Sequence, residues 1–232
     1  MLEVKELTGG TPMLTKLNFK LANGGTYGVY ARTRKEQTAL LALLAGDTAP
    51  DEGQVLIGGF DLGTEASNAK KSIGYLPYDD PTPDELSPVE YLLLIAQIKG
   101  MSRERAIRRV QELLCATGLD AWRDAPMSSL SAYERRTTAL LQTLLTNPEF
   151  LLWDDPTAGL SYEDGARILR HVKELGGEHT VLLSLRRLSD LSRLCDEILV
   201  IENGGFVGAF EANSPALKEY ENKFKYATGG NA

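Results

Sequence analysis

Residues 26–46 contain, in order, a short apolar strand, a polar turn and an apolar helix that closes on a glycine. This is the layout of a phosphate-binding loop. In the pattern G-x-x-x-x-G-K-[ST], glycines let backbone amides close around phosphates, the lysine neutralises charge and the last hydroxyl holds Mg²⁺. Three of the four defining positions differ here, because the pattern falls on Ala31, Glu36, Gln37 and Thr38. We therefore expect the shape of a nucleotide-binding site with little of its chemistry. The candidate binding residues are Ala31, Arg32, Thr33, Arg34, Lys35, Glu36, Gln37, Thr38 and Ala39.

Two charge changes in this loop argue against phosphate. Gln37 stands in the lysine position, where a charge-assisted contact is worth about 1.5 to 3 kcal/mol, so ATP should bind more weakly by about one to two decades. Glu36 has two interpretations: its carboxylate takes the place of a phosphate at the helix N-terminus, or it is a favourable first-turn residue. Arg32, Arg34 and Lys35 either hold an anion in another geometry or form a solvated cluster. Without glycines, the loop is not expected to adopt positive φ angles.

Further motifs follow the loop in a characteristic order. Residues 73–77 read Ile-Gly-Tyr-Leu-Pro and lead to Leu-Ser-Pro-Val-Glu at 86–90. Residues 130–134 read Leu-Ser-Ala-Tyr-Glu, and residues 150–160 read Phe-Leu-Leu-Trp-Asp-Asp-Pro-Thr-Ala-Gly-Leu. With the loop, these segments resemble the Q-loop entry, signature, Walker B strand and D-loop of the ATP-binding cassette (ABC) subunit of a membrane transporter. The resemblance covers nearly the whole chain and is most similar to export-type, ABC-2-like subunits.

The resemblance assigns roles to several single residues. Asp154 would hold Mg²⁺ through water, with the Thr38 hydroxyl on the opposite side. Asp155 stands where working members have the glutamate that polarises the attacking water. It is one methylene shorter, and a misplacement of about 1 Å can cost on the order of a hundredfold in rate. Arg186 replaces the switch histidine and cannot shuttle protons at neutral pH, and Tyr78 replaces the Q-loop glutamine.

The signature positions hold Ser131, Ala132, Tyr133 and Glu134. In working members this segment meets the ATP of the opposite subunit at a helix N-terminus. Both glycines are lost here, and Tyr133 would place a ring where the phosphate approaches unless it turns aside. The alternative is that Ser131 only caps a helix.

The elements that position these residues can be predicted from periodicity. Antiparallel strands are expected over 3–7, 14–22 and 54–61, buried strands over 71–77, 149–154 and 180–184, and a hairpin over 197–210. Helices are expected over 87–99, over 102–117 with Ile107, Val110, Leu113 and Leu114 buried, and over 131–146, 161–175 and 187–194. The chain after Tyr226 is predicted to be a loose tail.

By resemblance, these elements form an α/β fold with a P-loop NTPase-like core, an antiparallel β-subdomain and an inserted α-helical subdomain. We expect a single cassette domain over residues 1–232. Its core would occupy about 1–77 and 148–232, and the helical subdomain about 78–147.

Composition limits the partners and the compartment. The net charge of −7 and the lack of a basic run argue against nucleic acid. Cys115 and Cys195 have no metal-binding or disulfide spacing, which favours a reducing cytosol. No apolar run approaches the roughly 20 residues that span a bilayer, so no direct membrane insertion is expected. The predicted location is the cytoplasm, at the inner face of the cell membrane, through a partner.

We interpret the chain as a cassette subunit that kept its fold and lost its ATPase, acting as a structural or regulatory partner of a membrane permease. A second cassette, as homo- or heterodimer, would complete the complex. ATP and Mg²⁺ are the cofactors that the resemblance implies. One alternative is slow hydrolysis through Asp154 and Asp155, and another is a soluble binding module outside transport.

The permease would dock between Tyr78 and Gln97. There the apolar residues Leu92, Leu93 and Leu94 follow an acidic, proline-rich loop. An ordinary helical core beside a solvated loop would give the same pattern, so both interpretations stay open.

Overall fold

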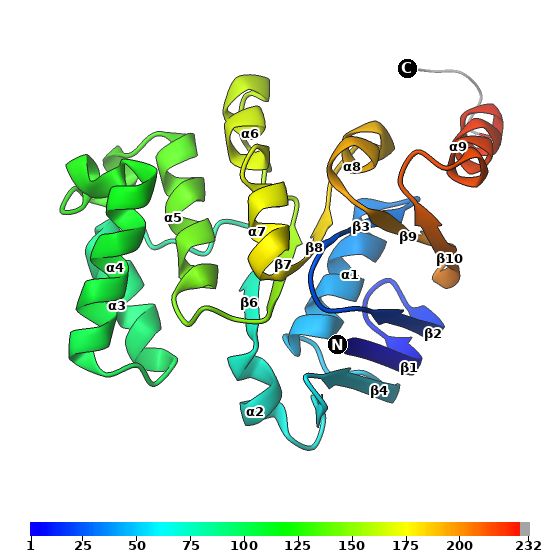
Figure 1. Ribbon diagram of the computed structural model, residues 1–232, viewed down its shortest axis with the longest axis horizontal. Coiled ribbons are helices and arrows are strands. Elements are labelled where there is room, and N and C mark those ends of the chain that lie inside the picture. The colour runs from blue at the N-terminus through cyan, green and yellow to red at the C-terminus, as the bar shows by residue number, and fades with distance from the viewer. Residues whose placement is uncertain (228–232) are drawn as a thin grey trace.

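The computed structural model describes residues 1–227, which form two sheets and a set of helices (Figure 1). An antiparallel sheet has the order β2-β1-β4-β5, with bounds β1 Leu2–Gly9, β2 Leu14–Leu21, β4 Glu52–Ile57 and β5 Phe60–Asp61. A second sheet has the order β10-β9-β3-β8-β7-β6. Its bounds are β3 Thr26–Ala31, β6 Ile73–Leu76, β7 Phe150–Asp154, β8 Thr180–Ser184, β9 Glu197–Glu202 and β10 Gly205–Glu211. In this sheet β10 runs antiparallel to β9, and the other neighbours are parallel.

Some of the helices cover the two faces of the parallel sheet, and others form a separate subdomain. The helices are α1 Arg34–Ala45, α2 Ala66–Lys71, α3 Pro88–Ile98, α4 Arg103–Thr117, α5 Ala132–Leu144, α6 Tyr162–Leu169, α7 Val172–Glu178, α8 Leu188–Leu194 and α9 Pro215–Ala227. Two short 3₁₀ helices lie at Leu119–Trp122 and Met127–Ser129. Leucines of α1 share one core with residues of both sheets, while α5 to α8 share a second core with the opposite face of the parallel sheet.

The topology brings the candidate residues to one edge. Parallel strands end on the same side of a sheet, and ligands of such folds bind outside those carboxyl ends. Ser184 of β8 pairs with Val29 of β3 and with Asp154 of β7. The segments that follow these three strands therefore start side by side.

A helical subdomain of α3, α4 and α5 lies at the left of Figure 1, away from the antiparallel sheet. Leu92 is fully buried in its core and packs against α4 and α5, which excludes this one side chain from the docking surface considered over residues 78–97. The predicted fold class, with its P-loop-type core, antiparallel sheet and helical subdomain, is confirmed.

The structure corrects several element predictions. The helix expected over 161–175 is two helices, α6 and α7. The chain bends between them and brings Gly176 against Thr26, where an added Cβ would collide with the Thr26 hydroxyl. Ile107 was expected to be buried but is 45% exposed, because Ala106 and Val110 supply the inner face of α4. The strand over 54–61 divides into β4 and β5 at a Gly-Gly turn.

Two helices, α2 and α9, were not predicted from the sequence. Of the tail expected after Tyr226, only Ala227 lies within the described residues, as the end of α9. Cys115 is exposed, Cys195 is buried, and both are free thiols. Among residues 1–227, no helix combines the length and apolar character needed to cross a bilayer.

Candidate functional site

The connection from β3 to α1 is only two residues long. β3 ends at Ala31 and α1 begins at Arg34, inside the segment that the sequence pattern assigns to the loop. Thr33 caps the helix: its Oγ1 accepts the Glu36 N–H at 3.3 Å, and Glu36 Oε2 accepts the Thr33 N–H at 3.0 Å. None of residues 31–37, all of which the structure describes, has a positive φ. The segment is thus a helix start closed by a reciprocal cap.

The buried Glu36 carboxylate joins two distant parts of the chain. Its Oε2 also accepts the Thr33 hydroxyl at 2.9 Å, and its Oε1 accepts the N–H of Gly204 at 2.9 Å. Gly204 lies in the turn between β9 and β10. The first-turn role, one of the two interpretations of Glu36, is present, and the same side chain also fixes the hairpin against α1.

Gln37 is turned into the core. Its side chain is 4% exposed, and Nε2 donates to the carbonyl oxygens of Val29 at 3.2 Å and Leu185 at 3.5 Å. Buried amides require such acceptors, because an unpaired polar group in the interior is costly. The residue in the lysine position therefore ties β3 to the segment after β8.

Asp154 is fully buried at the end of β7. Its Oδ1 accepts the Ser184 hydroxyl at 2.7 Å, whereas its buried Oδ2 makes no hydrogen bond of normal geometry. Burial raises the pKa of this carboxyl, and the hydroxyls of Thr38 and Ser184 oppose the shift. Asp154 and Thr38 are thus neighbours, as the resemblance implied.

Asp155 follows with a backbone φ of 42°, in the left-handed region. Its N–H donates to Ser184 Oγ at 3.0 Å, and its Oδ1 accepts the N–H of Thr157 at 3.2 Å and the Thr157 hydroxyl at 2.7 Å. Aspartate is among the residues that tolerate this conformation, because its short carboxylate bonds the backbone two residues on. One oxygen of Asp155 is therefore held by its own turn.

Tyr78 contacts the start of α1. The Arg34 guanidinium carbon lies 3.9 Å from the centroid of the Tyr78 ring, a cation–π distance. The Q-loop position is therefore in contact with the β3–α1 junction through an arginine and an aromatic ring.

The signature residues form a second capping box. Ser131 Oγ accepts the Glu134 N–H at 3.3 Å, and Glu134 Oε2 accepts the Ser131 N–H at 2.8 Å. The capping role considered for Ser131 is thus confirmed. The Tyr133 ring lies 3.8 Å from the Arg167 guanidinium carbon of α6, so Tyr133 turns aside onto that helix.

Arg136 was not recognised from the sequence, yet it connects the whole region. It is buried, and its guanidinium donates to five main-chain carbonyls at 2.7 to 3.4 Å. These belong to Pro77, Tyr78, Asp154, Asp155 and Pro156. Burial lowers the pKa of Arg136, and nearby carboxylates, Asp155 foremost, oppose the shift. Helix α5 is thereby fixed to the ends of β6 and β7.

The neighbouring Arg135 holds the acidic loop. Its Nε donates to Asp80 at 2.9 Å, and its guanidinium also pairs with Asp84. The acidic residues of this loop are exposed. Two of its four carboxylates, however, are paired to α5.

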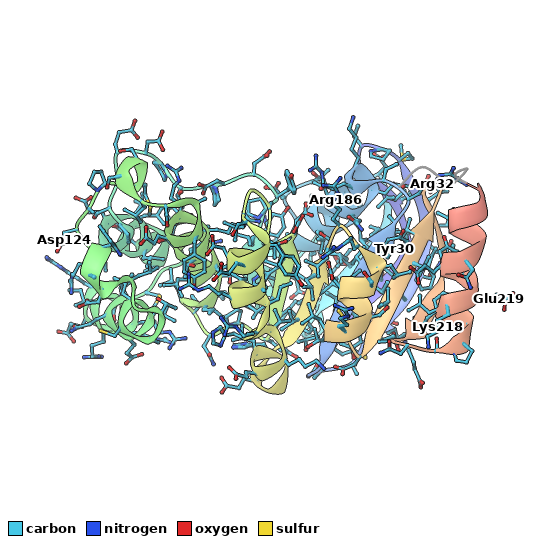
Figure 2. All side chains as sticks on the ribbon, turned by 90° about the horizontal axis from the view of Figure 1, so that it is seen from above. Tyr30, Arg32, Asp124, Arg186, Lys218 and Glu219 are labelled. Carbon is cyan, nitrogen blue, oxygen red and sulfur yellow. The ribbon has the colours of Figure 1, made fainter. Side chains whose placement is uncertain are left out.

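An open cleft of about 1200 Å³ lies over the β3–α1 junction. Of the candidate residues, it brings together Ala31, Arg32, Thr33, Arg34, Lys35, Gln37, Tyr78, Asp155 and Arg186. Glu36, Thr38, Ala39, Asp154 and the four signature residues do not line it. Figure 2 shows Arg32 and Arg186 on the same side of the core, whereas Asp124 lies at the far end of the helical subdomain.

Comparison with known proteins gives one family. Residues 14–158 match the family model described as ABC transporter. Nod factor export ATP-binding protein I of Rhizobium sp. (strain N33) is 29% identical over 202 residues, which are 87% of this chain and 66% of that protein. Linearmycin resistance ATP-binding protein LnrL of Bacillus subtilis (strain 168) is 25% identical over 205 residues, again 66% of its length. The chain thus spans slightly less than two thirds of the length of these two relatives.

Solved structures show the same fold. An ATP binding subunit of an ABC transporter superposes with a TM-score of 0.83 at 21% identity, over 97% of this chain and 100% of that chain. CbiO1 from Clostridium perfringens, described as part of the ABC transporter complex cbiONQ, superposes with a TM-score of 0.79 at 21% identity, over 97% of this chain and 94% of that one.

Proposed function

This chain belongs to the ABC transporter family, and we propose that it is a cassette subunit that no longer binds or hydrolyses ATP effectively. It acts as a structural or regulatory partner of a membrane permease. In this proposal residues 1–232 form one cassette domain, with the helical subdomain at about 78–147.

The observation that carries the proposal is the inward direction of Glu36 and Gln37. A triphosphate needs open amides and a cation at this place. Here the Thr33 N–H is already bonded to Glu36, a buried negative charge, and Gln37 Nε2 is bonded to two carbonyls. The residues of the β3–α1 junction therefore do not fit a phosphate chain.

The metal position is different, because Thr38 and Asp154 fit Mg²⁺. The buried Oδ2 of Asp154 makes no hydrogen bond of normal geometry, the Thr38 hydroxyl lies close to the same carboxyl group, and Mg²⁺ prefers oxygen ligands of this kind. A bound Mg²⁺ would supply positive charge to phosphate oxygens. This donor pair favours one second candidate function, a slow ATPase.

The groups that would assist hydrolysis are poorly suited to it. A general base must reach the water that it activates. Asp155 Oδ1 is instead bonded twice to Thr157, and the shorter side chain has less reach than glutamate. Arg186 is exposed at the rim of the cleft, and its guanidinium group is not a proton shuttle as an imidazole is.

A permease partner is supported by an exposed apolar surface on the helical subdomain. Leu94, Ile98 and Ile107 are 44%, 72% and 45% exposed, and an adjoining hollow of about 520 Å³ is lined by Leu93, Met101 and neighbours. Apolar patches of this kind mark contact sites on otherwise polar proteins. We place permease docking here, on the apolar docking patch of Leu94, Ile98 and Ile107, and not at Leu92. The relatives named as export ATP-binding proteins support an export-type transporter at the inner face of a cell membrane.

Steady-state phosphate release with ATP and Mg²⁺ tests the loss of activity. The purified chain should release no more phosphate than its Asp154→Asn variant. Turnover in the usual enzyme range of about 1 to 1000 per second, abolished by Asp154→Asn, would instead establish an active ATPase. Recovery of the chain from native cells solely as a soluble protein without a permease would favour the soluble binding module.

A further inference from the structure

The cleft over the β3–α1 junction is basic, although the chain as a whole carries a net charge of −7. Five basic residues line it: Arg32, Arg34, Lys35, Arg186 and Arg187. Only two carboxylates line it: Asp155, which accepts from Thr157, and Asp190, which pairs with Arg187 at 2.7 Å. The cleft therefore presents a net positive charge to solvent.

The positive charge lies on the rim. Arg34 and Lys35 are exposed in the first turn of α1, and Arg186 is exposed on the connection from β8 to α8. Glu36 is buried between two residues that line the cleft, Lys35 and Gln37. An anion placed deeply would meet this carboxylate at short range and low dielectric, where like charges repel strongly. An anionic ligand is therefore held best at the rim.

Aromatic rings accompany the arginines. Tyr78 lies under Arg34, and Tyr162 is 78% exposed with the Arg187 guanidinium carbon 6.0 Å from its ring centroid. Tyrosine and arginine are enriched at the energetic centres of protein interfaces. The cleft also exceeds the roughly 300 to 1000 Å³ of ordinary small-molecule pockets. These features suit an extended stretch of polypeptide.

Positive groups on two separate elements match successive carboxylates along a chain better than one compact phosphate group. Arginine binds carboxylates in a bidentate geometry, which adds specificity to the charge attraction. We propose that this cleft binds an acidic segment of a partner protein, with its carboxylates paired to Arg34, Lys35 and Arg186 and an apolar side chain on Tyr162. The inference rests on the proposed function, because a bound nucleotide would occupy the same cleft.

Fluorescence anisotropy tests the proposal on the full chain. The probe is a short fluorescein-labelled peptide of glutamates with one central tyrosine, and a lysine peptide of the same length is the control. The glutamate peptide should bind, the lysine peptide should not, and added salt should weaken binding because exposed charges are screened. Arg34→Glu with Arg186→Glu should weaken binding by about tenfold or more.

The matched control is Arg105→Glu with Arg108→Glu, which makes the same charge change at exposed positions of α4. It should leave peptide affinity within about twofold, since distant exposed charges are screened. If the double reversal at the cleft proves unstable, Arg34→Gln with Arg186→Gln should still weaken binding, by a smaller factor. Equal loss in both double variants, or no binding of the glutamate peptide, would overturn the proposal.

Two further measurements distinguish a phosphate ligand from a peptide ligand, and failure of this inference from failure of the proposed function. Inorganic tripolyphosphate should displace the peptide only at concentrations well above the peptide dissociation constant, and displacement below it would make the cleft a phosphate site and overturn the inference. ATP turnover is measured on the same preparation. If neither peptide binding nor ATP turnover is observed, only the proposed peptide-binding site is wrong. If ATP turnover is observed, the proposed function is wrong.

Discussion

Glu36 and Gly204, 168 positions apart in the chain, are joined by a 2.9 Å hydrogen bond from the Gly204 N–H to Glu36 Oε1. The other carboxylate oxygen closes the cap of α1 through Thr33. One buried side chain thus fixes both the start of α1 and the β9–β10 turn, and it keeps the Thr33 N–H of the β3–α1 junction occupied. Removal of this carboxylate should therefore affect both stability and ligand access.

Glu36→Ala should lower the free energy of unfolding by about 2 to 4 kcal/mol, since a cap is worth about 1 and an unsatisfied buried N–H costs about 1 to 3. Urea denaturation measures it. The control is Glu90→Ala in α3, because Glu90 holds the same capping-box position but is exposed and bonds only Ser87. This control should cost clearly less, because the Glu90 carboxylate is exposed. Equal costs for the two variants would contradict the role of the Gly204 bond.

Calorimetry with ATP and Mg²⁺ should show binding of the unmodified chain no tighter than millimolar. Glu36→Gly with Gln37→Lys should tighten it by about one to two decades, because a charge-assisted phosphate contact contributes about 1.5 to 3 kcal/mol. Glu36→Ala alone removes the carboxylate without adding a cation, and its gain should be smaller. Low-micromolar binding by the unmodified chain would show that the closed junction opens readily for nucleotide.

Helix starts were the most predictable feature of this chain. Ser87 with Glu90 and Ser131 with Glu134 follow the S/T-x-x-E pattern, and both form reciprocal caps. Thr33 and Glu36 have the same spacing, so an early start of α1 was also visible in the sequence. The phosphate-binding pattern predicts a loop over the same residues, whereas the structure has the capping box there. The missed helix α9 carries a similar signal, Ser214 followed by Pro215.

The role of Arg136 could not be predicted in this way. Its acceptors are main-chain carbonyls from two separate segments. These carbonyls are present whatever side chains the two segments carry, so the sequence of the segments does not mark them as partners of an arginine. Its position on α5 shows only that it faces inward. The direction of Gln37 was hidden for the same reason, because both of its acceptors are carbonyl oxygens. Side-chain to main-chain bonds leave little trace in sequence patterns.

Arg136→Met should destabilise the chain by about 2 to 4 kcal/mol, because it leaves buried carbonyls without donors. Chemical denaturation measures the loss, and Arg136→Lys should rescue little of it, since an ammonium cannot reproduce the guanidinium fork. Arg135→Met is the neighbouring control. Its ion pairs with Asp80 and Asp84 are partly exposed, so about 1 kcal/mol or less is expected. A larger loss at Arg135 than at Arg136 would refute this ranking.

The acidic loop should make stability depend on pH through Asp80. Burial opposes ionisation, but hydrogen bonds from Thr82 and Arg135 overcome it and hold the pKa of Asp80 below its ordinary 3.8. The folded chain therefore releases this proton more readily than the unfolded chain. The resulting stability is present above the unfolded pKa near 3.8 and is lost as pH falls through the lower folded pKa.

Compared with Asp80→Asn, the unmodified chain should be more stable at neutral pH, and the difference should shrink on acidification below about pH 4. Urea titrations across this range measure it. Asp79→Asn removes the same charge from the same loop and serves as the control. A difference between Asp80→Asn and the unmodified chain that stays constant with pH would exclude the linkage.

The apolar docking patch gives the sharpest test of the permease proposal. Leu94→Glu with Ile98→Glu places two charges on exposed positions of α3, so the fold should survive while contact with an apolar partner is lost. The amount of chain retained on washed membranes of the native host should fall by about tenfold or more. Two central residues of an interface can contribute that much binding energy. Circular dichroism and thermal denaturation verify that the variant is folded.

The control for this patch is Trp122→Glu, a charge placed at another exposed large apolar residue of the helical subdomain, 46% exposed. It should leave the membrane-bound fraction unchanged if docking is confined to the patch. Leu92 is unsuitable as a test position because its complete burial would make any charged replacement unfold the subdomain. Equal membrane association of the patch variant and the unmodified chain would place permease contact elsewhere, and equal loss with Trp122→Glu would show a general effect of charge on the subdomain.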